Sequence, residues 1–113
     1  MNPIQKNIYI DCGSTFTATM AVKRTNGQAF DLTGYTARSQ LRKSTFSKVA
    51  YDVTATVSSP ATSGIVTLSM TAEQTSAVPE GRYLYDLEIV SSSSGIVYRT
   101  HSGIASVSGE VTR

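Results

Sequence analysis

The chain has 113 residues, of which 40% are hydrophobic and 16% are charged, and its formal net charge is +2. This length fits one domain, residues 1–113, and the small charge without any block of like charge argues against a nucleic-acid partner. No apolar run reaches the roughly 20 residues of a membrane span and none resembles a signal peptide, so we expect synthesis in a cytoplasm and no membrane contact.

The N-terminal segment, residues 1–7, is polar apart from Ile4 and precedes the first clear turn. We predict a flexible arm that orders on docking, because chain ends of this kind are seldom held by a core. Three of its residues are candidate partner contacts, namely Asn2, Ile4 and Lys6.

Alternation of apolar and polar residues becomes clear in "STFTATMAV", where Phe16 and Met20 point one way and the threonines point the other. This period of two predicts a strand that is covered on one side. The pair Asn26-Gly27 then predicts a tight hairpin with a type I′ turn, in which both central residues have positive φ.

Strand-like alternation resumes from Tyr35 to Leu41 and stops at the polar "RKSTFSK". We interpret this stretch as a loop with Phe46 tucked back against the domain. Further strands are predicted over residues 49–57 and in "IVTLSM", with a hairpin-like connection bracketed by Pro60 and Gly64.

One segment, "TAEQTSAV", has the signals of a short helix, because Thr71 and Gln74 have the spacing of a capping box. It leads into "PEGRYLYDLEI", whose heavy alternating row predicts a central strand. We expect the core to include Phe16, Met20, Leu32, Tyr35, Leu68, Tyr83, Tyr85 and Leu87.

The final segment is less clear, since either Ile96 and Tyr98 or Val97 and Arg99 could face inward. Several short strands, one short helical crossing and no βαβ spacing predict an all-β fold. The leading expectation is an immunoglobulin-like antiparallel β-sandwich of about seven strands, with a small barrel as the alternative. The paired Cys residues and the Trp of antibody domains are missing.

Candidate catalytic chemistry is scarce. We interpret His101 as an exposed strand-end residue, and Cys12 as a half-buried apolar residue that cannot form a disulfide or a zinc site alone. Asp86 and Glu88 share a strand face, where we expect ion pairs with a neighbouring arginine. The sequence therefore predicts no enzyme, no metal site and no cofactor.

Two blocks of the chain, residues 15–44 and 70–113, together resemble the small immunoglobulin-like domains of tailed-bacteriophage virion proteins. They are similar to the N-terminal domain of upper baseplate proteins, which link receptor-binding parts to the tail. The elements that carry the resemblance are "DLTGY" at 31–35, Gly81 with Tyr83, Tyr85 and Asp86, Gly95 with Arg99, Gly103, and "VTR" at 111–113.

This resemblance implies a non-enzymatic building block that is present in several symmetry-related copies on a virion, in contact with tail, baseplate, fibre or capsid proteins. The sequence departs from the baseplate protein by ending at Arg113, without the long C-terminal extension. This departure leaves the position on the particle open: a tail or baseplate adaptor, or a fibre-attachment module, is the first expectation, and a capsid decoration or cement protein is an alternative.

Contacts with partners are expected at the arm, at the loop of residues 42–48 and at the C-terminus. Beyond the arm, the candidates are Arg42, Lys43, Phe46, Lys48, Glu110, Thr112 and Arg113. A carbohydrate-binding module is the competing class, because Tyr9, Tyr98 and Phe46 would suit it if exposed.

Overall fold

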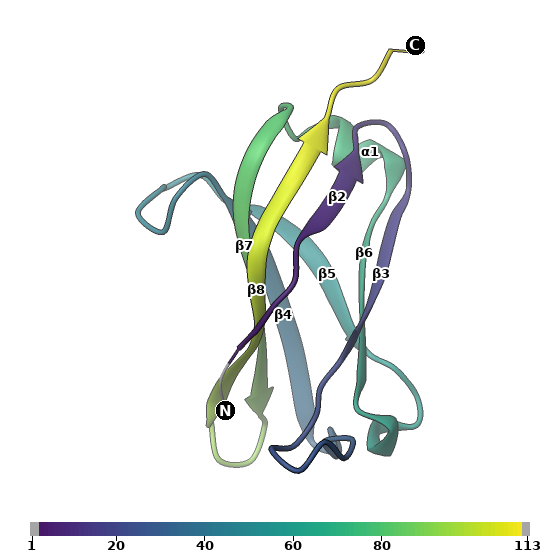
Figure 1. The fold of residues 1–113 in the computed structure, drawn as a ribbon, viewed down its shortest axis with the longest axis vertical. Helices are drawn as coiled ribbons and strands as arrows, with labels where there is room; N and C mark the ends of the chain where they lie inside the picture. The colour runs from purple at the N-terminus through teal and green to yellow at the C-terminus, as the bar shows by residue number, and fades with distance from the viewer. Residues whose placement is uncertain (1–2, 112–113) are drawn as a thin grey trace.

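The computed structural model describes residues 3–111 and contains two packed β-layers (Figure 1). A 3-10 turn, η1 (Ala61–Ser63), follows the fifth strand, and one helix, α1 (Ala72–Ser76), follows the sixth. The strands are β1 (Ile4–Gln5), β2 (Ile8–Asp11), β3 (Phe16–Ala21), β4 (Tyr35–Arg42), β5 (Tyr51–Val57), β6 (Ile65–Met70), β7 (Gly81–Ser91) and β8 (Val97–Ser108).

The two layers are joined by one strand that takes part in both. In the first layer β7 lies between β4 and β8 and is antiparallel to each, and in the second β6 is antiparallel to β3. Residues 51–53 of β5 pair with β4, and residues 54–57 pair with β6. Counting β1 and β2 together as strand A makes β4, β7 and β8 strands C, F and G, and the grouping of these three in one sheet is the immunoglobulin-like arrangement. The predicted immunoglobulin-like sandwich is confirmed, with eight strands instead of about seven.

The N-terminal strands make the first layer mixed rather than purely antiparallel, because β1 and β2 both run parallel to β8. Ile4 and Gln5 pair with β8, and the Lys6 N–H donates to the Ser102 carbonyl at 2.9 Å. The prediction of a free arm is therefore wrong for residues 3–7. Ile8 and Ile10 follow directly in β2 and are buried in the core, which holds the end of this segment to the sandwich. Residues 1 and 2 of the predicted arm lie outside the described residues.

The hairpin at Asn26-Gly27 forms, but the predicted type I′ turn is wrong. Gly27 has a φ of 86°, whereas no residue other than glycine has a positive φ in the described chain. The Gly27 N–H donates to the Arg24 carbonyl, and the Asn26 side chain accepts a hydrogen bond from the Gln28 N–H at 3.0 Å. This local bond satisfies Asn26 without a left-handed backbone, and one glycine then completes the turn.

The predicted core residues lie between the layers. All of them are buried except Tyr35, which is half-buried and packs edge-on against Phe30 at 5.5 Å between ring centroids. The buried set comprises Phe16, Met20, Leu32, Leu68, Tyr83, Tyr85 and Leu87.

The short helix begins as its capping box predicts. The Gln74 N–H donates to the Thr71 hydroxyl at 3.1 Å, and the Thr71 N–H donates to the Gln74 side chain at 2.8 Å. Thr75 is fully buried and its hydroxyl bonds to the Ser14 and Ala72 carbonyls, which fixes α1 against the β2–β3 turn.

The two tyrosines of β7 are buried with their hydroxyl groups satisfied. Tyr83 donates to the Pro79 carbonyl at 2.6 Å, and Tyr85 donates to the Lys6 carbonyl. Gly103 makes the second contact possible, because a Cβ at this position would collide with the Lys6 backbone. The predicted central strand is confirmed, and one of its hydroxyl groups helps to hold the N-terminal segment in place.

Pairing along β8 decides the question that the sequence left open: Tyr98 lies opposite the buried Ile89, whereas Arg99 lies opposite Glu88 on the outer face, and Ile96 and Val97 are both exposed. A bulge follows in the same strand. Leu87 pairs with His101 and Glu88 pairs with Arg99, so Thr100 has no partner of its own on β7. Thr100 and His101 are consequently both buried, whereas Tyr98 is half-buried. A β-bulge produces this change of face because it adds one residue to one strand only.

Candidate interaction surface

The loop between β4 and β5 projects away from the sandwich in Figure 1. Phe46 lies in this loop with 93% of its surface exposed, and Val49 is 60% exposed. The prediction that Phe46 is tucked against the domain is therefore wrong. The polar residues around it leave the loop without enough apolar surface to fold back onto the body.

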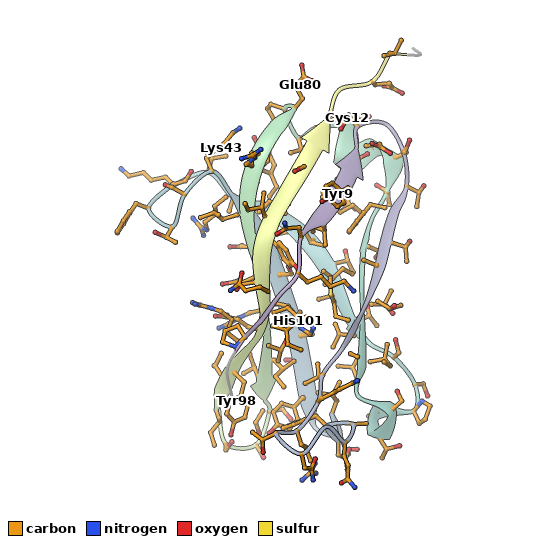
Figure 2. The ribbon with its side chains drawn as sticks, in the orientation of Figure 1. Tyr9, Cys12, Lys43, Glu80, Tyr98 and His101 are labelled. Atoms are coloured by element: carbon orange, nitrogen blue, oxygen red, sulfur yellow. The ribbon has the colours of Figure 1, made fainter. Side chains whose placement is uncertain are left out.

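Two basic residues hold the base of this loop. The Arg42 guanidinium donates to the Ser47 carbonyl and to the Gln40 side chain, which closes the loop on itself. The Lys43 ammonium lies 4.3 Å from the centroid of the Tyr83 ring, in a cation–π contact with β7. Figure 2 shows Lys43 beside this strand. The loop is therefore anchored at its base, while its aromatic residue is presented to solvent.

The outer face of β4, β7 and β8 lies beside the loop and carries a charged network. Arg38 pairs with Glu88 at 2.8 Å and Arg99 pairs with Asp86 at 3.3 Å, so the predicted ion pairs are confirmed. Burial raises the pKa of Asp86, and Glu88 raises it further, against the opposing effect of the arginines. Such exposed pairs contribute little to stability. They give this face both positive and negative charges.

An open groove of about 540 Å³ runs along this face and reaches the base of the loop. Ser44 and Thr45 line its loop end, while Leu84 and Ile104 supply apolar surface. Leu84 is 41% exposed and was not singled out from the sequence. Its outward position follows from the strict alternation of β7, so the sequence pattern of this strand could have predicted the exposure of Leu84.

Apart from Lys48, which belongs to the loop itself, the remaining predicted contact residues that the structure describes do not gather at this surface. Ile4 is exposed on β1, and the Lys6 side chain reaches across to the Thr19 carbonyl at 3.4 Å. Lys48 is exposed in the loop, and Glu110 lies close to Gly13 near the C-terminal end. Asn2, Thr112 and Arg113 fall outside the described residues.

The aromatic candidates for carbohydrate binding are dispersed. Tyr9 is 72% exposed on β2, whereas Tyr98 is half-buried and packs edge-on against Phe30 at 6.2 Å (Figure 2). Phe46 lies on the loop described above. Across the described chain these three side chains form no shared platform.

His101 is 2% exposed, so the prediction of an exposed strand-end histidine is wrong. Its Nδ1 lies 2.9 Å from the Thr100 hydroxyl, and the ring also bonds to the backbone of Ala21. Burial, together with the nearby Lys6 charge, lowers its pKa. The bulge at Thr100 brings His101 inside, and an alternating pattern in the sequence gives no sign of it.

Cys12 is half-buried as predicted, and its thiol donates to the Val78 carbonyl at 3.3 Å. Within residues 3–111, His, Cys, Asp and Glu side chains nowhere gather in the threes that a metal ion needs. No helix in this part of the chain is long and apolar enough to cross a bilayer.

Strand order and layer division thus define the class as an immunoglobulin-like β-sandwich. No protein-family model matches the sequence, and no curated protein matches it either. Among solved structures, the chain is similar to the crystal structure of the Lin-41 filamin domain, with a TM-score of 0.48 and 17% identity. This match covers 88% of this chain and 81% of the filamin chain.

Proposed function

We propose that the chain is a non-enzymatic structural component of a tailed-phage virion, which acts as a tail or baseplate adaptor or a fibre-attachment module. It works through protein–protein contacts, in several copies within a symmetric assembly. The sequence resemblance motivates this function, and one structural observation supports an interaction role, namely the exposed Phe46 on an anchored loop.

Phe46 combines a large exposed apolar surface with a low entropic cost of docking. An aromatic side chain contributes strongly to an interface when it enters an apolar pocket, and an anchored loop loses little entropy on docking. Arg42 and Lys43 supply that anchoring here. The exposed Lys48 lies two residues away from Phe46 in the same loop. We therefore expect a partner surface that has an apolar pocket with carboxylates nearby.

Incorporation into particles tests this function. The phage would be grown in cells that supply its particles with the wild-type protein, with Phe46→Ser or with the control Ile96→Ser. Ile96 is 48% exposed and lies in the distant β7–β8 turn. The ratio of this protein to the major capsid protein would be measured in purified particles by quantitative mass spectrometry. We expect at least a tenfold loss for Phe46→Ser and no loss for Ile96→Ser. Equal incorporation of both variants would contradict the proposed role of the loop, and absence of the wild-type protein from particles would contradict the virion assignment.

The position within the particle separates the first proposal from a capsid decoration protein, because the two differ in copy number and location.

A second candidate function, carbohydrate binding, is favoured by the 72% exposure of Tyr9 on the outer surface of β2. Glycan-array binding by the wild-type protein that is lost in Tyr9→Ala would support this alternative.

A further inference from the structure

The outer edge of β3 has backbone groups that point away from its only strand partner. The Val22 N–H donates to the Gly64 carbonyl at 2.7 Å, and the same register continues along β3 and β6. In an antiparallel ladder, hydrogen-bonded and non-hydrogen-bonded pairs alternate. The even-numbered residues of β3 therefore bond to β6, and Thr17, Thr19 and Ala21 direct their N–H and C=O groups outward.

Side chains, rather than another strand, lie against this edge. The Lys6 ammonium donates to the Thr19 carbonyl at 3.4 Å, and His101 bonds to the backbone of Ala21. The strand that precedes β3 in the chain, β2, pairs with β8 and not with β3. The outward N–H groups of Thr17 and Thr19 have no hydrogen-bond partner among residues 3–111. An edge in this state is a template for an added strand.

An open groove of about 580 Å³ continues from the Ala21 end of this edge. Its apolar and aromatic walls are Ile4, Val22, Phe30 and Tyr98, and the buried His101 contributes to its lining. An extended chain on β3 that passes Ala21 would enter this groove directly.

The rim of the groove is basic. Lys23 and Arg24 line it, and Arg24 also lies 5.8 Å from the centroid of the Phe30 ring. Lys6 is close enough to His101 to influence its charge. No Asp or Glu is among the described residues that line the groove. The site would therefore attract a ligand that combines an apolar side chain with neighbouring carboxylates.

We propose that β3 and this groove bind an extended acidic segment of a different protein, which adds a strand along Thr17–Ala21 and packs an apolar side chain against Phe30 and Tyr98. A partner carboxylate would take over the Lys6 ammonium and release the Thr19 carbonyl for a backbone hydrogen bond. A second copy of this chain is disfavoured because antiparallel pairing of two β3 edges about Thr19 would bring the two Lys6 ammonium groups together at the centre of the pair. This inference concerns a surface remote from Phe46 and stands apart from the virion assignment.

Synthetic peptides of about eight residues would serve as the probe. Each peptide alternates Thr and Val and contains one Phe near one of its two ends. Two residues beside this Phe carry the charge and are both Glu, both Gln or both Lys. Affinity would be measured by fluorescence polarisation against the full chain. Backbone amide exchange by NMR would locate the bound peptide. We expect the Glu peptides to bind at least tenfold more tightly than the Lys peptides, with new protection at Thr17, Thr19 and Ala21. Ala18 and Met20 provide the internal control, because their N–H groups already bond to β6 and are protected in both states.

Two variants test the parts of the site separately. Thr19→Pro removes an outward N–H without removing a bond to β6, and it is expected to reduce Glu-peptide affinity at least tenfold. The double variant Lys23→Glu/Arg24→Glu changes only exposed side chains and is expected to reverse the charge preference, so it keeps the test valid if Thr19→Pro fails to fold. Failure of every Glu peptide to bind, unchanged charge preference in the double variant, or protection confined to the loop of residues 42–48 would overturn the proposal.

Discussion

The buried tyrosines of β7 and the exposed phenylalanine of the β4–β5 loop are opposite uses of aromatic side chains. Tyr83 and Tyr85 are 2% and 4% exposed, and both hydroxyl groups bond to backbone carbonyls. Phe46 is 93% exposed. One Lys43 contact connects the two regions, because its ammonium rests on the Tyr83 ring while its backbone begins the loop.

This difference separates what holds the fold from what is available to a partner. An aromatic residue in β7 gains its burial energy within the chain, whereas Phe46 can gain it only from a second molecule. Stability measurements should therefore respond to substitutions in β7, and incorporation or binding measurements should respond to substitutions in the loop.

Leu87→Ala is expected to have the largest effect on stability. Leu87 is fully buried at the centre of β7, so the substitution should lower the free energy of unfolding by about 2–5 kcal/mol. Phe46→Ala, in comparison, should change it by less than about 0.5 kcal/mol. Urea unfolding followed by circular dichroism measures both. A comparable loss in Phe46→Ala would show that the loop packs on the sandwich in solution.

Tyr85→Phe should have the next largest effect. It removes the donor to the Lys6 carbonyl and leaves that group without this partner, at a cost of about 1–3 kcal/mol. Tyr9→Phe is the matched control, because Tyr9 is exposed and loses the same hydroxyl. Equal stability of the two variants would mean that the bond does not hold the N-terminal segment.

Burial raises the pKa of Tyr85 to about 12, from the ordinary value of 10.0. The unfolded chain therefore releases this proton at lower pH than the folded chain, and stability should fall as pH rises from about 10 to 12. Thermal unfolding across this range, in wild type and Tyr85→Phe, should show a smaller fall in the variant. Parallel curves would contradict the buried state of this hydroxyl.

The pH dependence near neutrality should come from His101. Burial lowers the pKa of His101 below 6.5, so as pH falls the unfolded chain binds a proton at a higher pH than the folded chain. The contribution of His101 to the free energy of unfolding is therefore fully present above about pH 6.5 and should be lost as pH falls below it. The difference between the wild-type and His101→Gln curves isolates this effect, because Asp86, whose pKa is raised, is present in both. Identical slopes would place His101 in solvent.

The parts of the fold that sequence reasoning predicted are those with a local signal. The row Tyr83, Tyr85, Leu87 alternates without interruption, and the Thr71–Gln74 capping box lies within one helical turn. The parallel pairing of β1 and β2 with β8 joins residues almost a chain length apart, so no local pattern encodes it.

The candidate sites were harder to predict for related reasons. The sequence placed contacts in the β4–β5 loop but gave the wrong orientation for Phe46, since a single aromatic residue among polar ones carries no periodicity. It missed the groove beside β3 altogether. That groove depends on the bulge at Thr100, which turns His101 inward, and on a hairpin that brings Phe30 towards Tyr98.

Lys43→Ala should produce the smallest change in stability, and it tests the one contact that connects β7 with the loop. Loss of the contact with Tyr83 should cost about 0.5–1 kcal/mol in stability. Amide exchange in the loop should also become faster, because its base loses one anchor. Lys48→Ala is the control, since Lys48 is exposed in the same loop. Equal exchange rates in the two variants would show that Lys43 does not brace the loop.

The central claim, that this chain is a virion component docked through its loop, is tested most directly by cryo-electron microscopy of the intact particle that encodes it. We predict density for the sandwich at the tail, baseplate or fibre attachment site, in symmetry-related copies, with Phe46 inserted into a pocket of a neighbouring protein. Density over the capsid lattice would instead assign a decoration protein. Absence of the sandwich from the particle, or a docked copy with Phe46 facing solvent, would contradict the account.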